Sequence, residues 1–135
     1  MTGENRKKNI VAAVRRGDES LRSARILLEA GQHADAVSRA YYAAFHYARA
    51  LLLTLGEEAR THGGLDRLLQ RDLVREGHLD PDVARLLSRL MQFRLEADYT
   101  AEYVFTEQGA TEELGAATRF VAEAQRVLRA GDWLD

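Results

Sequence analysis

Apolar side chains recur at alternating steps of three and four residues along most of the sequence, which is the period of an α-helix that buries one face. The pattern is clearest over residues 34–55, and it returns over 9–29, 61–77, 81–98 and 106–131. The apolar positions of the clearest stretch are Val37, Tyr41, Ala44, Ala48, Leu51 and Leu55. No stretch alternates apolar and polar residues for long enough to form a sheet. The sequence therefore predicts an all-α, up-and-down four-helix bundle, with the stretch at 61–77 as an additional short helix.

Residues with strong capping preferences support these helix ends. Thr61 and Thr106 precede helical stretches as N-caps, and Asp80 stands before Pro81, which suits the first position of a helix. Gly56 follows the clearest stretch, where a C-terminal glycine is expected. We therefore predict short turns between the helices rather than long linkers.

Length and composition exclude several classes of protein. The chain has 135 residues, which fits a single domain over residues 1–135. With 19 Lys+Arg against 21 Asp+Glu the net charge is −2, which disfavours a globally basic nucleic-acid binder but leaves room for a local basic face. The absence of cysteine excludes disulfide scaffolds, thiol catalysis and thiolate zinc sites. No apolar run is long enough to span a membrane and no signal-like segment opens the chain, so we expect a cytoplasmic protein without a membrane partner.

The signatures of common metal and nucleotide enzymes are missing. The sequence contains no glycine-rich phosphate loop, no His-x-x-x-His or Glu-x-x-His pair and no nucleophile elbow. Its four histidines are scattered, whereas a metal site needs at least three converging ligands. We therefore expect neither a metal site nor a cofactor.

Two groups of polar residues are candidate sites, and the first lies within residues 34–55. Ser38, Tyr42, His46 and Arg49 follow one another at steps of four, four and three, so they share one stripe of a helix. Ser38, Tyr42 and Arg49 are candidate ligand-binding residues, and His46 is a candidate catalytic residue. The alternative interpretation is that Tyr42 and His46 fill an amphipathic helix and have their polar atoms satisfied.

The second group ends the helix predicted at 81–98. Arg94 borders the apolar stripe, where a cation needs a partner, and Asp98 stands one turn later. The pair either closes the helix as a simple ion pair or holds Arg94 ready for a phosphate or a catalytic oxyanion. Arg94 is thus a candidate catalytic residue, and Asp98 and Tyr99 are candidate ligand-binding residues.

Several segments resemble HEPN domains, the small helical proteins of bacteria and archaea, in the same order along the chain. Residues 36–46 read AVSRAYYAAFH, residues 61–65 read THGGL, and residues 94–99 fit the pattern Arg-x-x-Ala-Asp-Tyr. A fourth segment also fits the family: residues 105–107 read FTE and are followed by the matching residues 117–120. Together the resemblance covers nearly the whole chain.

The resemblance implies an all-α bundle that is usually a homodimer and is often made beside a minimal nucleotidyltransferase. Many such pairs are similar to toxin–antitoxin modules, in which the HEPN protein is a metal-independent ribonuclease and the nucleotidyltransferase silences it. The family's catalytic pattern is an arginine followed, after four to six residues, by a histidine. Arg94 matches that arginine, but Tyr99, Thr100 and Ala101 occupy the positions of the histidine.

We therefore expect a HEPN homodimer in a toxin–antitoxin-like system that binds a minimal nucleotidyltransferase partner and RNA or nucleotide. A first alternative is a ribonuclease in which Arg94 works with a displaced histidine, either His46 or His62, if the fold brings one of them close. A second alternative is a non-catalytic helical adaptor. In some relatives the partner attaches nucleotide to a tyrosine after the histidine. Because no histidine precedes Tyr99 or Tyr103 at the matching place, we expect both to be core anchors or dimer contacts.

Overall fold

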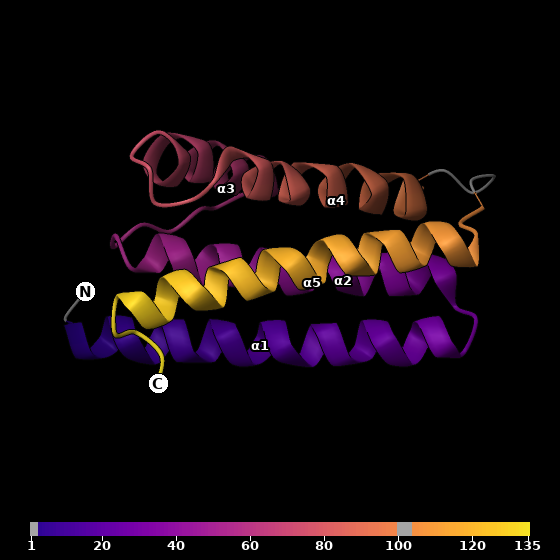
Figure 1. Cartoon of the computed structure of the whole chain (residues 1–135), viewed down its shortest axis with the longest axis horizontal. Coiled ribbons are helices and arrows are strands. Elements are labelled where there is room, and N and C mark those ends of the chain that lie inside the picture. The colour runs from indigo at the N-terminus through magenta and orange to yellow at the C-terminus, as the bar shows by residue number, and fades with distance from the viewer. Residues whose placement is uncertain (1–2, 100–103) are drawn as a thin grey trace.

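The computed structural model describes residues 3–99 and 104–135, and four long helices dominate it. The elements in chain order are α1 (Gly3–Glu29), α2 (His33–Leu53), α3 (His62–Leu68), a π-helix η1 (Leu69–Val74), α4 (Pro81–Tyr99) and α5 (Glu107–Ala130). The long helices run alternately in opposite directions, and α3 lies beside the start of α4 (Figure 1). The described residues contain no strand. The predicted all-α up-and-down bundle with one additional short helix is confirmed.

Helix α2 lies at the centre of the bundle, in contact with α1, α4 and α5. Its alanines let neighbouring helices approach closely, while Tyr41, Tyr47 and Leu51 fill the space between them and are almost completely buried. Because α2 contacts every other long helix, its polar side chains meet residues that are distant in the sequence. This position makes α2 the element on which a site can be assembled.

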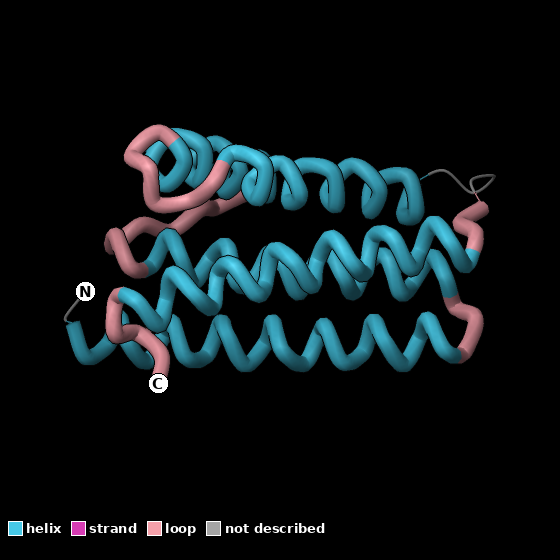
Figure 2. Tube along the Cα trace, in the orientation of Figure 1, coloured by secondary structure: helices cyan, strands magenta, loops and turns pink. Residues whose placement is uncertain are grey.

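The predicted helix starts are confirmed by hydrogen bonds. Thr61 Oγ1 accepts a hydrogen bond of 2.8 Å from the backbone N–H of Gly64, and Thr106 Oγ1 accepts one of 2.9 Å from Gly109. Asp80 Oδ1 accepts one of 2.7 Å from the N–H of Asp82, and Pro81 is the first residue of α4. The segments between helices are correspondingly short where they are described (Figure 2).

Two elements differ from the prediction. Helix α1 begins at Gly3 rather than near residue 9, and Arg6 Nη1 donates a 3.3 Å hydrogen bond to the carbonyl of Thr54 at the end of α2. This contact joins residues 48 positions apart, so the apolar period could not reveal it. The stretch 61–77 is not one regular helix, because after α3 the backbone widens into η1, where the N–H of Arg75 bonds to the carbonyl of Gln70, five residues back, at 3.1 Å.

A polar contact in the core ties three helices together. The buried Tyr47 of α2 donates a 2.5 Å hydrogen bond to Asp18 Oδ1 of α1, and its hydroxyl accepts one of 3.0 Å from Gln125 Nε2 of α5. Burial, followed by the hydrogen bond to Asp18, raises the pKa of the Tyr47 phenol, so the hydroxyl stays protonated. The ring is therefore fixed at both its apolar and its polar ends.

Gly17 of α1 faces this fixed ring. A Cβ atom at Gly17 would lie 2.6 Å from Tyr47 Cδ2 and 3.2 Å from the carbonyl oxygen of Ala43. We expect Gly17→Ala to lower the free energy of unfolding by about 1–2 kcal/mol, because the overpacking exceeds the gain in helix propensity. Gly115→Ala in α5 is the matched control, since a Cβ there has no neighbour within 4 Å and should stabilise the helix slightly. Urea denaturation measures both, and equal effects of the two changes would contradict the close packing.

The described helices include none that is long and apolar enough to cross a membrane.

Candidate functional site

The last two turns of α4 place Arg94 on an aromatic surface of α2. The Arg94 guanidinium carbon lies 5.5 Å from the ring centroid of Tyr41 and 5.2 Å from that of Tyr42. Its side chain is only 15% exposed. A guanidinium over aromatic rings at these distances is held by cation–π attraction, which strengthens when the charge is withdrawn from water. Arg94 is thus positioned by two rings.

Asp98 supplies the countercharge that the sequence predicted. Arg94 Nε lies 3.1 Å from Asp98 Oδ2, an ion pair one helical turn apart. The geometry of the pair does not form a hydrogen bond, however, and the buried Nε has no hydrogen-bond partner among the described residues. Buried guanidinium N–H groups are normally satisfied by a hydrogen bond. The Nε–H of Arg94, which has no such bond, can therefore still donate to an acceptor.

His62 reaches the same place from a different element. It is the first residue of α3, directly after the N-cap Thr61. Its ring stacks on Phe45 with 4.5 Å between centroids, and its Nδ1 forms a short hydrogen bond with the hydroxyl of Tyr41. Burial and then the charge of Arg94 lower the pKa of His62, so the imidazole is neutral near pH 7. We call Tyr41, Tyr42, His62, Arg94 and Asp98 the Arg94 cluster.

The bond between Tyr41 and His62 determines what the imidazole can do. Burial raises the pKa of the Tyr41 phenol although Arg94 lowers it, so the hydroxyl keeps its proton. When the phenol donates to Nδ1, which is one of the two arrangements that this hydrogen bond allows, the proton of the neutral ring is on Nε2. His62 then offers an N–H donor rather than a free lone pair. In this arrangement the cluster binds an anion better than it removes a proton.

His46 occupies a different part of the molecule. It lines a hollow between α1 and α2, together with Arg16, Arg39 and Tyr42. The charges that act on His46 are those of Arg16, Arg49 and Arg39, whereas the charge that acts on His62 is that of Arg94. Of the two histidines considered as partners of Arg94, the structure brings His62 and not His46 into the cluster.

The environment of His46 makes the stability of the fold sensitive to acid. Burial, followed by the three arginines, lowers the pKa of His46 from 6.5 to about 4. Between these values the unfolded chain binds a proton that the folded chain does not, so stability is lost as the pH falls through this window. From about pH 7.5 to about pH 5, we expect this residue to lower the free energy of unfolding by about 2 kcal/mol. His46→Gln should flatten the pH dependence in urea titrations, and a pH dependence that stays unchanged would contradict this origin of the acid sensitivity.

The remaining candidate residues do not gather at the Arg94 cluster or at the hollow that His46 lines. Arg49 is exposed, with its guanidinium 6.0 Å from the ring centroid of Phe45. Ser38 is half-buried, and no hydrogen bond joins it to the rest of its stripe in the described structure. Tyr99 is 76% exposed at the end of α4, so of the two roles expected of it the core anchor is wrong, and the dimer contact stays a prediction. Tyr103 lies outside the described residues.

The sequence does not reveal several residues that form the Arg94 cluster and the hollow at His46. The apolar period places Tyr41 on the apolar stripe alone, although its hydroxyl bonds to His62. The sequence does not distinguish Arg16 and Arg39, because a lone arginine in an amphipathic helix carries no signal of its own. The position of His62 directly after a capping threonine was visible, but its distance from Arg94 was not.

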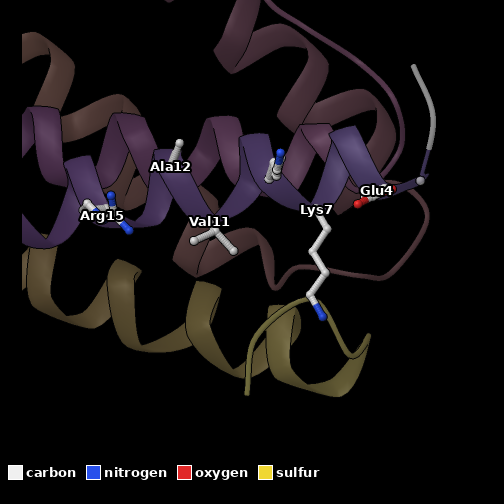
Figure 3. Close-up of a pocket in the computed structure, with 7 residues that line it drawn as sticks. Glu4, Lys7, Val11, Ala12 and Arg15 are labelled. Atoms are coloured by element: carbon white, nitrogen blue, oxygen red, sulfur yellow. The ribbon is translucent and has the colours of Figure 1, made fainter.

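Neither a metal site nor a ligand site on the first half of α1 is formed by converging side chains in the described residues. The described part of the chain holds no group of three or more His, Cys, Asp or Glu side chains that could bind a metal ion. A wide hollow runs along the first half of α1, and Figure 3 shows the side chains that line it, among them Lys7, Val11 and Arg15. All of its lining residues come from that single helix, so no second element converges to fix a ligand.

Comparisons with known proteins agree with the fold and with the resemblance in sequence. The family model of the HEPN domain matches residues 10–129. A protein of Methanocaldococcus jannaschii named "Putative toxin MJ0605" is 34% identical over 123 residues, which cover 91% of each chain. A Gloeobacter violaceus protein named only as a UPF0332 protein is 33% identical over 114 residues, 84% of this chain and 90% of its own. A second M. jannaschii protein, "Putative toxin MJ0142", is 24% identical over 122 residues, 90% of this chain and 83% of its own.

Proposed function

Because the chain belongs to the HEPN domain family, we propose that it is a toxin-like HEPN protein that binds a phosphate group of RNA or of a nucleotide at the Arg94 cluster. One observation carries the proposal. Arg94 is half-buried over two tyrosine rings and, beside its ion pair with Asp98, keeps an Nε–H without a hydrogen-bond partner among the described residues. Guanidinium groups positioned in this way are the preferred ligands of phosphate oxygens in proteins.

The other members of the cluster fit the same ligand. His62 adds a neutral N–H donor, which binds a phosphate oxygen without requiring acidic pH. Tyr42 is half-buried, and such aromatic rings are the platforms on which bases of single-stranded RNA stack. Asp98 holds Arg94 in place from one side only. The cluster therefore combines phosphate donors with an aromatic surface.

The direct test is binding of a fluorescently labelled single-stranded oligoribonucleotide, and separately of AMP, in the presence of EDTA. We expect binding of the oligoribonucleotide that weakens as the salt concentration rises, because phosphate contacts release counterions. Folded protein that binds neither probe at low salt would contradict the proposal.

A second candidate function is metal-independent RNA cleavage, favoured by the placement of His62 beside Arg94 around the same two tyrosines. Cleavage would require a proton to leave the ribose 2′-hydroxyl for His62, while Arg94 stabilises the charge on the phosphorane. In the tautomer in which the Tyr41 hydroxyl donates to Nδ1, the ring has no free lone pair for that proton, and only a ring protonated on Nδ1 would offer one on Nε2. We therefore rank binding above cleavage.

Total RNA incubated with the protein in EDTA separates the two functions. Intact RNA with the folded wild type is the result expected for a binding protein. Cleavage that disappears in both Arg94→Ala and His62→Gln, but persists when the exposed His78 is replaced by Gln, would establish the ribonuclease. Equal cleavage by all four proteins would indicate a contaminating nuclease.

We also propose that the protein acts as a homodimer with a minimal nucleotidyltransferase as its partner in a toxin–antitoxin-like system. For the homodimer, Leu95 and Tyr99 are 43% and 76% exposed one turn apart on α4, directly beside Arg94 and Asp98. Exposed apolar side chains next to a site are typical of an interface. Light scattering should show a dimer that Leu95→Glu converts to monomer.

The nucleotidyltransferase partner follows from the family resemblance. It is tested by co-purification of the tagged chain with the product of the neighbouring gene. A wild type that is monomeric, or that captures no such product, would contradict the corresponding proposal.

A further inference from the structure

The hollow between α1 and α2 has the chemistry of an anion site. It encloses about 390 Å³ and is lined by Arg16 and Ser20 of α1 and by Arg39, Tyr42 and His46 of α2. The Arg39 guanidinium lies over the Tyr42 ring, with its carbon 4.8 Å from the centroid. Two arginines, two serines, a histidine and one glutamate from two helices thus line one space, together with the Tyr42 ring.

His46 lies in the wall of this hollow and is not satisfied by the protein. The residue is only 9% exposed, and its Nδ1 is buried without a hydrogen-bond partner among the described residues. Buried polar atoms are rarely left in this state, and an unsatisfied one indicates a group that is supplied from outside. The lowered pKa described above keeps the ring neutral near pH 7, so it can donate one N–H.

The charges around the hollow are not neutralised within the protein. Arg16, Arg39 and Arg49 all act on His46, and within the described residues none of the three forms an ion pair with a carboxylate. Glu19 lines the same hollow and is its single carboxylate. The net local charge is therefore positive although the whole chain carries −2. A phosphate group meets both the positive charge and the unsatisfied nitrogen of His46.

We propose that this hollow is a second phosphate site, in which Arg16 and Arg39 hold a phosphate group of the same RNA strand that occupies the Arg94 cluster. Tyr42 belongs both to this hollow and to the Arg94 cluster, since its ring contacts Arg39 and also Arg94. A single strand that passes over Tyr42 can place one phosphate on each side of it. This inference rests on the proposed function and adds the path of the strand across α2.

The test compares the affinity of a labelled single-stranded oligoribonucleotide for Arg16→Ala and Arg39→Ala with that for Arg15→Ala. Arg15 is the matched control, because it is the neighbour of Arg16 on α1 and lines the separate hollow of Figure 3. We expect each of the two site variants to bind about tenfold more weakly than wild type. The slope of log affinity against log salt should fall by about 0.7 for each lost contact. Affinities equal to that of Arg15→Ala would overturn the proposal.

Measuring Arg94→Ala in the same binding assay separates this inference from the proposed function. If Arg94→Ala loses binding while Arg16→Ala and Arg39→Ala keep it, the second site is wrong and the proposed function stands. If only Arg16→Ala and Arg39→Ala lose binding, the second site stands and the Arg94 cluster is not the RNA site.

Inorganic phosphate is the second probe, with the His46 ring resonances as the readout. In the wild type phosphate should shift them, and in the double variant of Arg16 and Arg39 it should not. A shift with phosphate but no binding of RNA would mean a free-anion site and would overturn the strand assignment. No shift and no RNA binding would overturn the site itself. Because both arginines are exposed, thermal melting should confirm that every variant is folded.

Discussion

Replacing Arg94 by alanine is expected to weaken the binding of single-stranded RNA about 100-fold. The change removes a guanidinium that the fold holds over Tyr41 and Tyr42, and with it the charge-assisted hydrogen bonds to a phosphate. It also leaves Asp98 without its cation, which adds repulsion toward an anionic ligand. Fluorescence anisotropy at constant salt concentration measures the loss.

Two variants show whether this loss is specific. Arg85→Ala removes the same side chain from the same helix, but Arg85 is exposed and, among the described residues, pairs with Asp82 alone, so the affinity should not change. Arg94→Lys keeps the charge and loses the planar fork, so it should restore the affinity only in part. If Arg94→Ala binds RNA like wild type and only lowers stability, Arg94 is a structural residue and the helical adaptor becomes the better description.

The second large effect concerns stability and lies away from the site. Glu113 of α5 is 2% exposed, and its carboxylate accepts hydrogen bonds of 2.6, 2.9 and 3.1 Å from Arg89 of α4. We expect Arg89→Ala to lower the free energy of unfolding by about 3 kcal/mol, because it leaves a buried carboxylate without its partner. Urea denaturation measures the change.

Two controls define what the pair contributes. The double variant Arg89→Met with Glu113→Leu should recover most of the stability, because the cost arises from the unpaired charge rather than from the lost bonds. Arg126→Ala removes an exposed pairing with Glu123 and should change stability by less than about 0.5 kcal/mol. If Arg89→Ala is no more harmful than Arg126→Ala, the pairing of Arg89 with the buried Glu113 does not hold α4 against α5.

The helices were predictable because their determinants are local. Apolar residues that recur every three or four positions lie within one or two helical turns of each other, and so do a capping threonine and the N–H that it binds. Both signals can therefore be found in the sequence itself. The start of α1 and the widening at η1 depend on contacts between distant segments, such as Arg6 with Thr54. A period along the chain contains no information about those contacts.

The candidate site was predictable to the same extent and for the same reason. The pairing of Arg94 with Asp98 spans one helical turn, and the structure forms it. The meeting of Arg94 with His62 joins α4 to α3 through Tyr41 of α2, so it depends on how three helices pack.

The stripe from Ser38 to Arg49 shows the limit of helical geometry. Its members do lie on one side of α2, but the helices packed there divide them. Tyr42 reaches the Arg94 cluster, whereas His46 lines the hollow against α1. The sequence predicts that Tyr42 and His46 lie on the same face of α2, but it does not predict which residues of other helices each of them contacts.

The most direct test of the Arg94 cluster as the RNA site is an NMR titration that follows the ring resonances of the histidines as a single-stranded oligoribonucleotide is added. His62 lies within the cluster, and the exposed His78 lies in the turn before α4 and serves as the internal reference. We expect the His62 resonances to shift in proportion to the bound fraction while those of His78 stay in place. RNA that saturates the protein and leaves His62 unmoved would show that the Arg94 cluster is not the binding site.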